Sequence, residues 1–352
     1  MAFFIFKGSC LDILPKLPEN LAHCCVTSPP YWNQRDYGVE GQLGLEETPD
    51  KYVEDMVKVF AGVKRALRPD GTLWLNIGDS YVTNKKAGLP GKNLIGIPWK
   101  VAFALQKDGW FLRSDVIWHK NDAKPENIDD RPYKGHEYFF LFSKTESYYF
   151  DIYAKGYHEE HKTKIALKES KSLFEEESKN TLPEGASYDT MLGRNRQTVW
   201  SLTKGSFKYE HFAPYPEELI IPAIAASTSE KGCCTYCGKP WIRKIERQEI
   251  DRKNPKFAAM AKGGATATTA GLAVLTKTGF RRKFHADWIP SCGCPTHEPI
   301  PCTVLDPFNG SGTSGLVAAR LGRSYYGCEL SQDHIDFSKK RIREAGFNMF
   351  GV

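Results

Sequence analysis

Near its C-terminal end the chain reads Asp306-Pro307-Phe308-Asn309-Gly310-Ser311-Gly312-Thr313. The apolar run Cys302 to Leu305 comes directly before this stretch and predicts a short buried strand, and the apolar spacing after it predicts a helix over Thr313 to Leu321. A further strand, Tyr325 to Cys328, follows that helix. This alternation predicts an α/β protein, in which ligands bind where the strands of the sheet end.

The glycines of this stretch predict a ligand site. Gly310, Gly312 and Gly315 fit the pattern G-x-G-x-x-G, which lets a ligand approach the backbone at a helix N-terminus. Glu329, after the next strand, is placed to accept hydrogen bonds from ribose hydroxyls. The pattern suits both NAD and S-adenosylmethionine. We favour S-adenosylmethionine, because too little chain follows for a complete dinucleotide fold and because Asp306 puts a carboxylate beside the loop, where a cationic amino group can pair with it.

A second informative stretch lies near the start, where Thr27-Ser28-Pro29-Pro30-Tyr31-Trp32 follows the apolar run Leu21 to Val26. The exocyclic amino nitrogen of cytosine or adenine is a poor nucleophile, because its lone pair is conjugated into the ring. The Ser28 hydroxyl and the Pro29 carbonyl are two acceptors that would hold the amino hydrogens and localise that lone pair, and the prolines stiffen the turn. The rings of Tyr31 and Trp32 predict a surface on which a flipped base stacks.

With these two stretches the chain resembles the β class of amino-group DNA methyltransferases, in which the catalytic tetrapeptide precedes the recognition region and the cofactor loop comes last. The resemblance covers most of the chain. It extends to Leu67–Asp79 as a core strand, to Asp115–Asn121 with Pro125 as a segment that lines the pocket, and to His211–Leu219 as the segment before the cofactor helix. The chain departs from the family at Gly8-Ser9, where relatives often have Gly-Asp.

The resemblance implies an enzyme that transfers a methyl group from S-adenosylmethionine to a base of double-stranded DNA. Ser-Pro-Pro-Tyr favours N4 of cytosine, and N6 of adenine is the alternative, because adenine enzymes more often carry Asp first. The implied catalytic residues are Ser28, Pro29, Pro30, Tyr31 and Trp32. The implied cofactor site consists of Asp306, Phe308, Gly310, Gly312, Thr313, Glu329, Phe212 and Pro216. A cognate restriction endonuclease is a further expected partner.

The predicted fold is a Rossmann-like methyltransferase sheet with helices on both faces and a circularly permuted motif order. Residues 1–150 are expected to form the catalytic part, 151–210 the target recognition region, 211–227 a return to the methyltransferase domain, 228–300 a basic zinc-binding insertion and 301–352 the cofactor-binding part. Arg194, Asn195, Arg196 and Gln197 in the recognition region are candidates to contact base edges, or belong to an ordinary polar loop.

The insertion combines a basic surplus with a candidate metal site. The chain has a net charge of +6, and residues 228–300 hold 13 Lys and Arg against 6 Asp and Glu. Such a surplus suits a polyanion, although a solvated loop has the same composition. Cys234 and Cys237 form one close pair and Cys292 and Cys294 another, which is the ligand set of a structural, tetrahedral zinc site. Cys233 is an alternative ligand to Cys234.

Composition points to a cytoplasmic location. No apolar run approaches the roughly 18 residues of a membrane span, and the first residues lack the features of a signal peptide. Ten cysteines are then expected to be thiols or metal ligands. Two other functions remain open, an NAD-dependent oxidoreductase and a non-catalytic DNA-binding protein. Pro301-Cys302 matches the nucleophile of carbon-5 cytosine methyltransferases by letters, but the predicted burial of Cys302 argues against that role.

Overall fold

The computed structural model describes residues 1–82, 88–123, 125–152, 154, 196–203, 215–249, 280–295 and 298–347. The chain divides into two compact units. The first consists of Met1–Gly232 with Ile300–Val352, and the second of Cys233–Pro299. The second unit falls inside the segment 228–300 that the sequence marks as an insertion. None of the described helices is long and apolar enough to cross a membrane.

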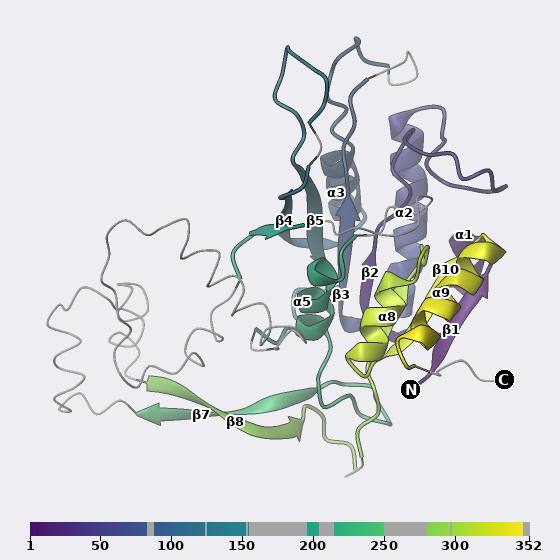
Figure 1. Ribbon diagram of the computed structural model, residues 1–352. Coiled ribbons are helices and arrows are strands. Elements are labelled where there is room, and N and C mark those ends of the chain that lie inside the picture. The colour runs from purple at the N-terminus through teal and green to yellow at the C-terminus, as the bar shows by residue number, and fades with distance from the viewer. Residues whose placement is uncertain are drawn as a thin grey trace, which may run out of the picture. The chain divides into compact units, whose positions relative to one another are not determined.

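The first unit is built on one mixed sheet of eight strands (Figure 1). Their order across the sheet is β1 (Phe3–Lys7), β10 (Ser324–Glu329), β9 (Thr303–Asp306), β2 (Ala22–Thr27), β3 (Leu67–Ile77), β5 (His136–Ser143), β4 (Phe111–Lys120) and β6 (Val199–Leu202). Neighbours from β1 to β3 pair in parallel, whereas β5 is antiparallel to both β3 and β4. Every residue of β2 and β9 is buried, which is why both appear in the sequence as continuous apolar runs.

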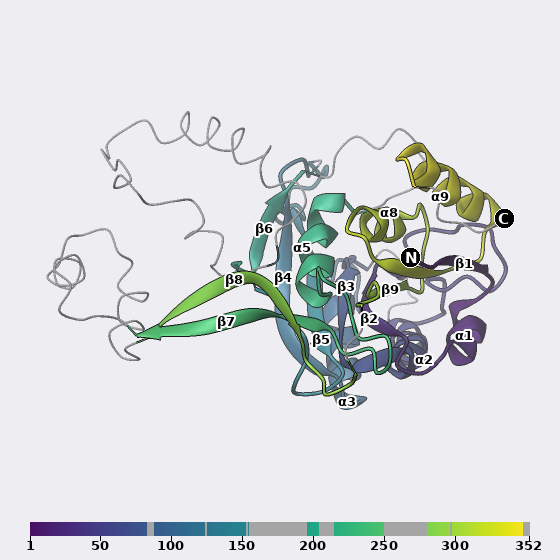
Figure 2. The same cartoon turned by 90° about the horizontal axis from the view of Figure 1, so that it is seen from below.

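Helices cover both faces of this sheet (Figure 2). One face carries α1 (Cys10–Ile13), the 3-10 helix η1 (Leu14–Lys16), α2 (Pro49–Ala66) and α3 (Ile97–Lys107). The other face carries α5 (Glu217–Ser227), α8 (Thr313–Arg320) and α9 (Gln332–Glu344). Each layer has its own hydrophobic cluster against the sheet. The mixed α/β architecture agrees with the prediction from the sequence.

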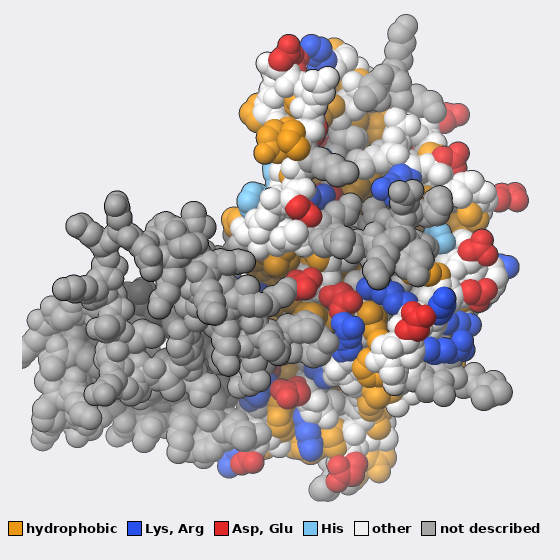
Figure 3. Space-filling model, in the orientation of Figure 1, with side chains coloured by type: hydrophobic (Ala, Val, Ile, Leu, Met, Phe, Trp, Pro, Cys, Tyr) orange, Lys and Arg blue, Asp and Glu red, His pale blue; other side chains and the backbone are white. Residues whose placement is uncertain are grey.

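The amphipathic helices show how sequence pattern leads to this layering. Helix α2 begins where the Thr48 hydroxyl accepts a hydrogen bond from the Lys51 N–H at 3.1 Å, and its apolar stripe is buried. Helix α9 begins at Ser331 in the same way, with Ile335 buried and Lys340 exposed. Figure 3 shows basic and acidic side chains interspersed over the outer surface of α8 and α9.

Strand β3 begins at Leu67, as does the segment Leu67–Asp79 that resembles a core strand of the family, and it runs through Pro69-Asp70-Gly71. Ala22 of β2 pairs with Leu67 and Cys24 pairs with Thr72, so β3 accommodates three extra residues in an irregularity of the ladder. Strands β1 and β6 were not predicted at all, because both are short strands at the edges of the sheet.

The second unit contains an antiparallel hairpin. It is formed by β7 (Trp241–Glu249) and β8 (Phe280–Pro290), with Trp241 opposite Pro290 at one end of the ladder. Two cysteine-containing loops, one before β7 and one after β8, adjoin that end. The Arg243 guanidinium lies 4.4 Å from the centre of the Trp288 ring. Hairpin pairing therefore brings together cysteines that are more than fifty positions apart in the sequence.

Candidate active site

The two informative stretches of sequence meet at one edge of the sheet. Strands β2 and β9 are parallel neighbours, with Cys25 opposite Leu305, so the loops that follow them start side by side. The Thr27 hydroxyl at the end of β2 donates a hydrogen bond of 2.6 Å to Oδ1 of Asp306 at the end of β9. Parallel pairing therefore joins segments that are 279 residues apart.

A cavity of about 390 Å³ opens at this edge. Its volume is within the range of about 300–1,000 Å³ that small-molecule sites occupy. The predicted site residues that line it are Ser28, Pro29, Pro30, Tyr31, Phe308, Gly310, Thr313 and Glu329. Gly8, Ser9 and Cys10 also line it, so the segment where this chain departs from the family belongs to the same site.

The glycine loop has the backbone shape that its sequence predicts. Gly310 has a φ of 50° and Gly312, the residue before α8, a φ of 77°. A Cβ atom on Gly312 would lie 2.5 Å from the Cβ of Ser338, so this glycine allows α8 and α9 to pack closely and does not itself line the cavity. Glu329 fixes the loop, because its Oε2 accepts a hydrogen bond of 2.7 Å from the Gly310 N–H.

Glu329 keeps acceptor capacity for a ligand. Its Oε1 accepts a second backbone hydrogen bond, from the Ser331 N–H at 3.0 Å, and its side chain is 12% exposed in the cavity. His334 Nδ1 also lies 3.4 Å from Oε1, and since a carboxylate offers about four acceptor positions, one remains for a ribose hydroxyl. The open glycine loop and this carboxylate are what an adenosine ligand requires. The site therefore fits S-adenosylmethionine, which when bound supplies an electrophilic methyl group on a sulfonium.

Asp306 lies elsewhere than the sequence suggested. It is 1% exposed and does not line the cavity, whereas its neighbour Pro307 does. Its carboxylate accepts hydrogen bonds from the Thr27 hydroxyl, from the Phe308 N–H at 3.0 Å and from the Tyr215 hydroxyl at 3.4 Å. Burial raises the pKa of Asp306 to about 6. The expected contact with a cationic amino group is corrected to an internal role, in which Asp306 ties β9 to β2.

The segment before α5 contributes one unpredicted residue. Tyr215 lines the cavity, and Pro216 is buried beside it at the start of the helix. Phe212, which the resemblance assigned to the cofactor site, lies outside the described residues. The same holds for Arg194 and Asn195 of the recognition region, whereas Arg196 and Gln197 are described and exposed.

The position of Trp32 differs from the prediction that both rings, Tyr31 and Trp32, form a stacking surface for the base. Its indole is 2% exposed, belongs to the core cluster that contains α2, and does not line the cavity. The indole N–H donates a hydrogen bond of 3.0 Å to the Glu46 carbonyl. Tyr31 alone of the pair lines the cavity. The Tyr31 ring faces the cavity and packs against the edge of this cluster, whereas the Trp32 ring lies inside it.

Tyr31 is anchored by Asn76 and Glu137, neither of which was predicted from the sequence to have a role in the site, whereas Lys120 belongs to the segment Asp115–Asn121 that was expected to line the pocket. The Tyr31 hydroxyl lies 2.7 Å from Oε2 of Glu137 and 3.1 Å from Oδ1 of Asn76. Glu137 is an ion-pair partner of Lys120, and all four side chains line the cavity. Glu137 and Lys120 come from β5 and β4, which pair antiparallel. The available signal was that a charged residue stands near the end of each of these strands, but only the pairing register brings the two to Tyr31.

Glycine at position 78 makes room for the tyrosine ring. A Cβ atom on Gly78 would lie 2.6 Å from Cε2 of Tyr31, closer than carbon atoms approach without a shift. Gly78 follows β3 directly, so the end of this strand passes against the ring. The hydroxyl contacts and the missing side chain together hold Tyr31 in one orientation beside Ser28.

The neighbouring parallel strands β2 and β9 bring the Ser-Pro-Pro-Tyr segment to the glycine loop and Glu329 at one edge of the mixed sheet, and this arrangement is that of an α/β methyltransferase. The model of the DNA methylase family, the N6/N4 class, matches residues 22–235 and 302–340. The chain is 32% identical over 369 aligned residues to the Type II methyltransferase M.Cfr9I of Citrobacter freundii, covering 99% of this chain and 90% of that protein. It is 30% identical to M.SmaI of Serratia marcescens, covering 96% and 90%.

A solved structure has the same fold. It is a putative DNA modification methylase from Thermus thermophilus, complexed with S-adenosyl-L-methionine, with a TM-score of 0.51 and 20% identity over 100% of this chain and 98% of that one. The chain belongs to the N6/N4 DNA methylase family. It is a DNA methyltransferase of the class that modifies the amino group of a base. Because the chain belongs to this family, the glycine loop is not interpreted as the dinucleotide site of an NAD-dependent oxidoreductase.

Proposed function

We propose that the methyl acceptor is N4 of cytosine in double-stranded DNA. The observation that carries this proposal is that Ser28, Pro29 and Tyr31 share one cavity with the glycine loop and Glu329. The serine form of the motif favours cytosine within the resemblance described above. A base that enters this cavity has to be flipped out of the duplex, because the amino group of a stacked base is not accessible to it.

The chain's own groups orient the amino nitrogen. Ser28 and the Pro29 carbonyl are acceptors at the end of β2, where the paired strands hold the backbone fixed. Two N–H hydrogen bonds to these oxygens would direct the nitrogen lone pair away from the protein and toward the cofactor end of the cavity. Fixed geometry of this kind lowers the barrier because no further ordering is needed in the transition state. The Tyr31 ring provides the apolar surface beside the base.

Lys120 favours a pyrimidine over adenine. Next to the ring nitrogen on the Watson–Crick edge, cytosine has the O2 carbonyl and adenine has a C–H group. The Lys120 ammonium carries three N–H donors, and its contact with Glu137 uses one. Its side chain is 21% exposed and lines the cavity, and we propose that one of the other donors reaches a flipped base there. An acceptor such as O2 can use such a donor, whereas a C–H group would leave it unpaired.

The modified base in DNA tests this proposal directly. We expect that DNA from a host expressing the protein, digested to nucleosides and analysed by mass spectrometry, contains N4-methylcytosine above the level in a host with the empty vector. The Ser28→Ala variant serves as the control for methylation by other enzymes. N6-methyladenine as the only new nucleoside would contradict the cytosine assignment. Absence of any new methylated base would contradict catalysis and favour a non-catalytic DNA-binding protein.

A restriction endonuclease is the proposed functional partner. The relatives with near full-length coverage are named Type II methyltransferases. Methylation by such an enzyme would protect a site from a nuclease of the same specificity. Resistance of the methylated host DNA to one sequence-specific nuclease, with cleavage of unmodified DNA at the same site, would identify the recognition sequence.

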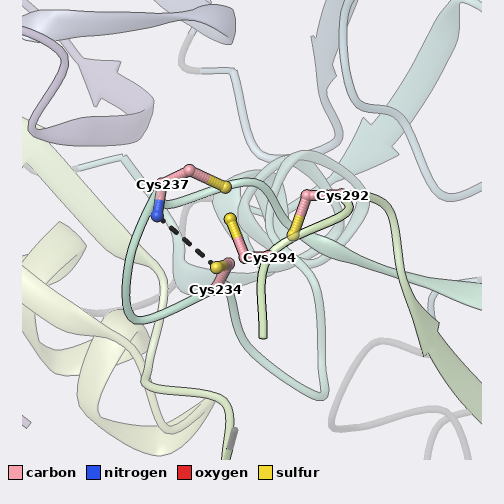
Figure 4. A group of neighbouring side chains, drawn as sticks. All are labelled: Cys234, Cys237, Cys292 and Cys294. Carbon is pink, nitrogen blue, oxygen red and sulfur yellow. Dashed lines mark hydrogen bonds between the residues drawn. The ribbon is translucent and has the colours of Figure 1, made fainter. Parts of the chain in front are cut away.

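We also propose a structural zinc ion in the second unit. The sulfur atoms of Cys234, Cys237, Cys292 and Cys294 all lie within 4.8 Å of one another and point toward a common centre (Figure 4). The backbone N–H groups of Tyr236 and Cys237 each donate to Cys234 Sγ at 3.4 Å, which suits a sulfur that carries negative charge. Four sulfur ligands without an open position fit a structural role. Cys234, and not Cys233, supplies the sulfur in this group.

Zinc content and cysteine substitution test this site. We expect about one zinc per chain in protein purified under reducing conditions without chelators, because four thiolates form a complete tetrahedral set. Cys292→Ser should lower the zinc content and make the second unit more sensitive to proteolysis. Cys24→Ala, which removes a buried thiol from the first unit, should retain the metal. Metal-free wild-type protein with an unchanged protease pattern would refute the proposal.

A further inference from the structure

A chain of hydrogen bonds leads from the proposed methyl-acceptor site to a buried carboxylate. Ser28 Oγ lies 3.3 Å from the Tyr31 hydroxyl, and that hydroxyl lies 2.7 Å from Oε2 of Glu137. All three side chains line the cavity, and they come from the end of β2, from the loop after it and from β5. The family motif accounts for the serine and the tyrosine, but nothing in it assigns a role to the carboxylate.

Glu137 is held as an acceptor from every side. Its side chain is 12% exposed, Lys120 pairs with one oxygen, and the Asn76 amide donates to the other at 3.2 Å. Although burial alone would raise the pKa of Glu137, the nearby Lys120 ammonium and the hydrogen bonds from Tyr31 and Asn76 outweigh it and lower the pKa. An ionised carboxylate has no proton to donate, so it accepts the hydrogen bond from Tyr31.

The Glu137 carboxylate therefore determines which group donates and which accepts in each hydrogen bond from Glu137 to Ser28. Tyr31 has a single hydroxyl hydrogen, and the shorter contact, 2.7 Å to the anion against 3.1 Å to Asn76, assigns that hydrogen to Glu137. The tyrosine oxygen is then left as an acceptor, and Ser28 donates to it. Once the Ser28 hydrogen points to Tyr31, the serine oxygen presents only lone pairs to the cavity.

We propose that Glu137 is a positioning residue that orients the hydrogen bonds of Tyr31 and Ser28, so that Ser28 Oγ accepts a hydrogen from the amino group of the target base. Without the anion, the Ser28 hydrogen is free to point at the amino nitrogen and to bind its lone pair, which would compete with attack on the methyl group. Hydrogen bonds in such a chain also strengthen one another, so the Ser28 oxygen becomes a better acceptor. The inference rests on amino-group methylation by this site, but not on the choice between cytosine and adenine.

Glu137→Gln is the primary test, because the amide keeps the size of the side chain but can donate to Tyr31. We expect the single-turnover rate of methyl transfer to fall by about ten- to a hundredfold, the range for one hydrogen bond to a charged group. The dissociation constant for S-adenosylmethionine should stay within about twofold, since Glu137 belongs to neither the glycine loop nor the Glu329 site. Glu126→Gln, at an exposed glutamate that pairs with Arg131, is the matched control.

Tyr31→Phe interrupts the chain while leaving the ring in place, and needs no new buried polar group. If the two residues act through one chain, the double variant Tyr31→Phe with Glu137→Gln should be no slower than the slower single variant. A purely structural role for Glu137 predicts additive losses, together with lower thermal stability of the single variants. Additive rate losses, or a Glu137→Gln variant with the wild-type single-turnover rate, would overturn the proposal.

The nucleosides in the wild-type product keep this test separate from the proposed function. If wild-type protein produces N6-methyladenine and the double variant is non-additive, the cytosine assignment fails and the role of Glu137 stands. If it produces N4-methylcytosine and Glu137→Gln has the wild-type rate, the cytosine assignment stands and the role of Glu137 fails.

Discussion

Ser28→Ala is expected to lower the single-turnover rate of methyl transfer by about a hundredfold or more, comparable with the loss of one preorganised hydrogen-bonding group in other enzymes. Ser28 lines the cavity next to Tyr31 and is proposed to supply one of two acceptors for the amino hydrogens. Its removal would leave the nitrogen lone pair conjugated with the ring. The affinity for the cofactor should stay unchanged, because Ser28 is separate from the glycine loop and from Glu329, which are the residues expected to bind the cofactor.

Rapid-quench measurement with labelled methyl donor and duplex DNA would give this rate, and calorimetry the cofactor affinity. Ser201→Ala is a suitable control, because that hydroxyl belongs to β6 and bonds to His119 outside the cavity lining. An equal loss of cofactor affinity in Ser28→Ala would show that the serine serves the cofactor and not the base.

Glu329→Ala is expected to weaken S-adenosylmethionine binding by roughly ten- to a hundredfold, or about 1.5–3 kcal/mol. The carboxylate would accept a hydrogen bond from a ribose hydroxyl while it holds the Gly310 N–H. At saturating cofactor the rate of methyl transfer should stay close to that of the wild type. The proposed contacts to the methyl acceptor are made by Ser28 and Pro29, which are separate from the glycine loop and Glu329.

Asp306→Asn gives a useful comparison, because the sequence alone would assign both acids to the cofactor. Asp306 bonds to Thr27, Phe308 and Tyr215 within the protein, so its substitution should affect the stability of the first unit more than cofactor affinity. Isothermal titration and thermal unfolding of both variants separate the two effects. Unchanged cofactor affinity in Glu329→Ala would contradict the assignment of the ribose site.

The sequence predicted the elements around the cofactor loop well, because their pattern is local. A four-residue apolar strand, a glycine turn and a helix with apolar spacing specify β9 and α8 without any information from distant residues. The fold class follows from the same alternation and is confirmed. The circularly permuted order, the domain bounds and the zinc insertion stay predictions.

Side-chain orientation was harder to predict, because it depends on distant partners. Trp32 and Tyr31 are adjacent aromatic residues that the sequence does not distinguish. Only the packing of α2 against the sheet shows that the Trp32 indole is buried. The role of Asp306 depends on Thr27, which is remote in sequence but adjacent across the ladder. The role of Glu137 follows from the antiparallel register of β4 and β5, which cannot be predicted from a local sequence pattern.

The strand order has a consequence for synthesis on the ribosome. Strands β1 and β2 emerge first, but β10 and β9 lie between them in the finished sheet. Translation of the 279 residues that separate Thr27 from Asp306 takes roughly 15 to 55 s at typical rates. Until then the nascent chain has no partner for the β9 side of β2 and no glycine loop. The enzyme can therefore modify DNA only after the segment that carries β9 and β10 has been synthesised.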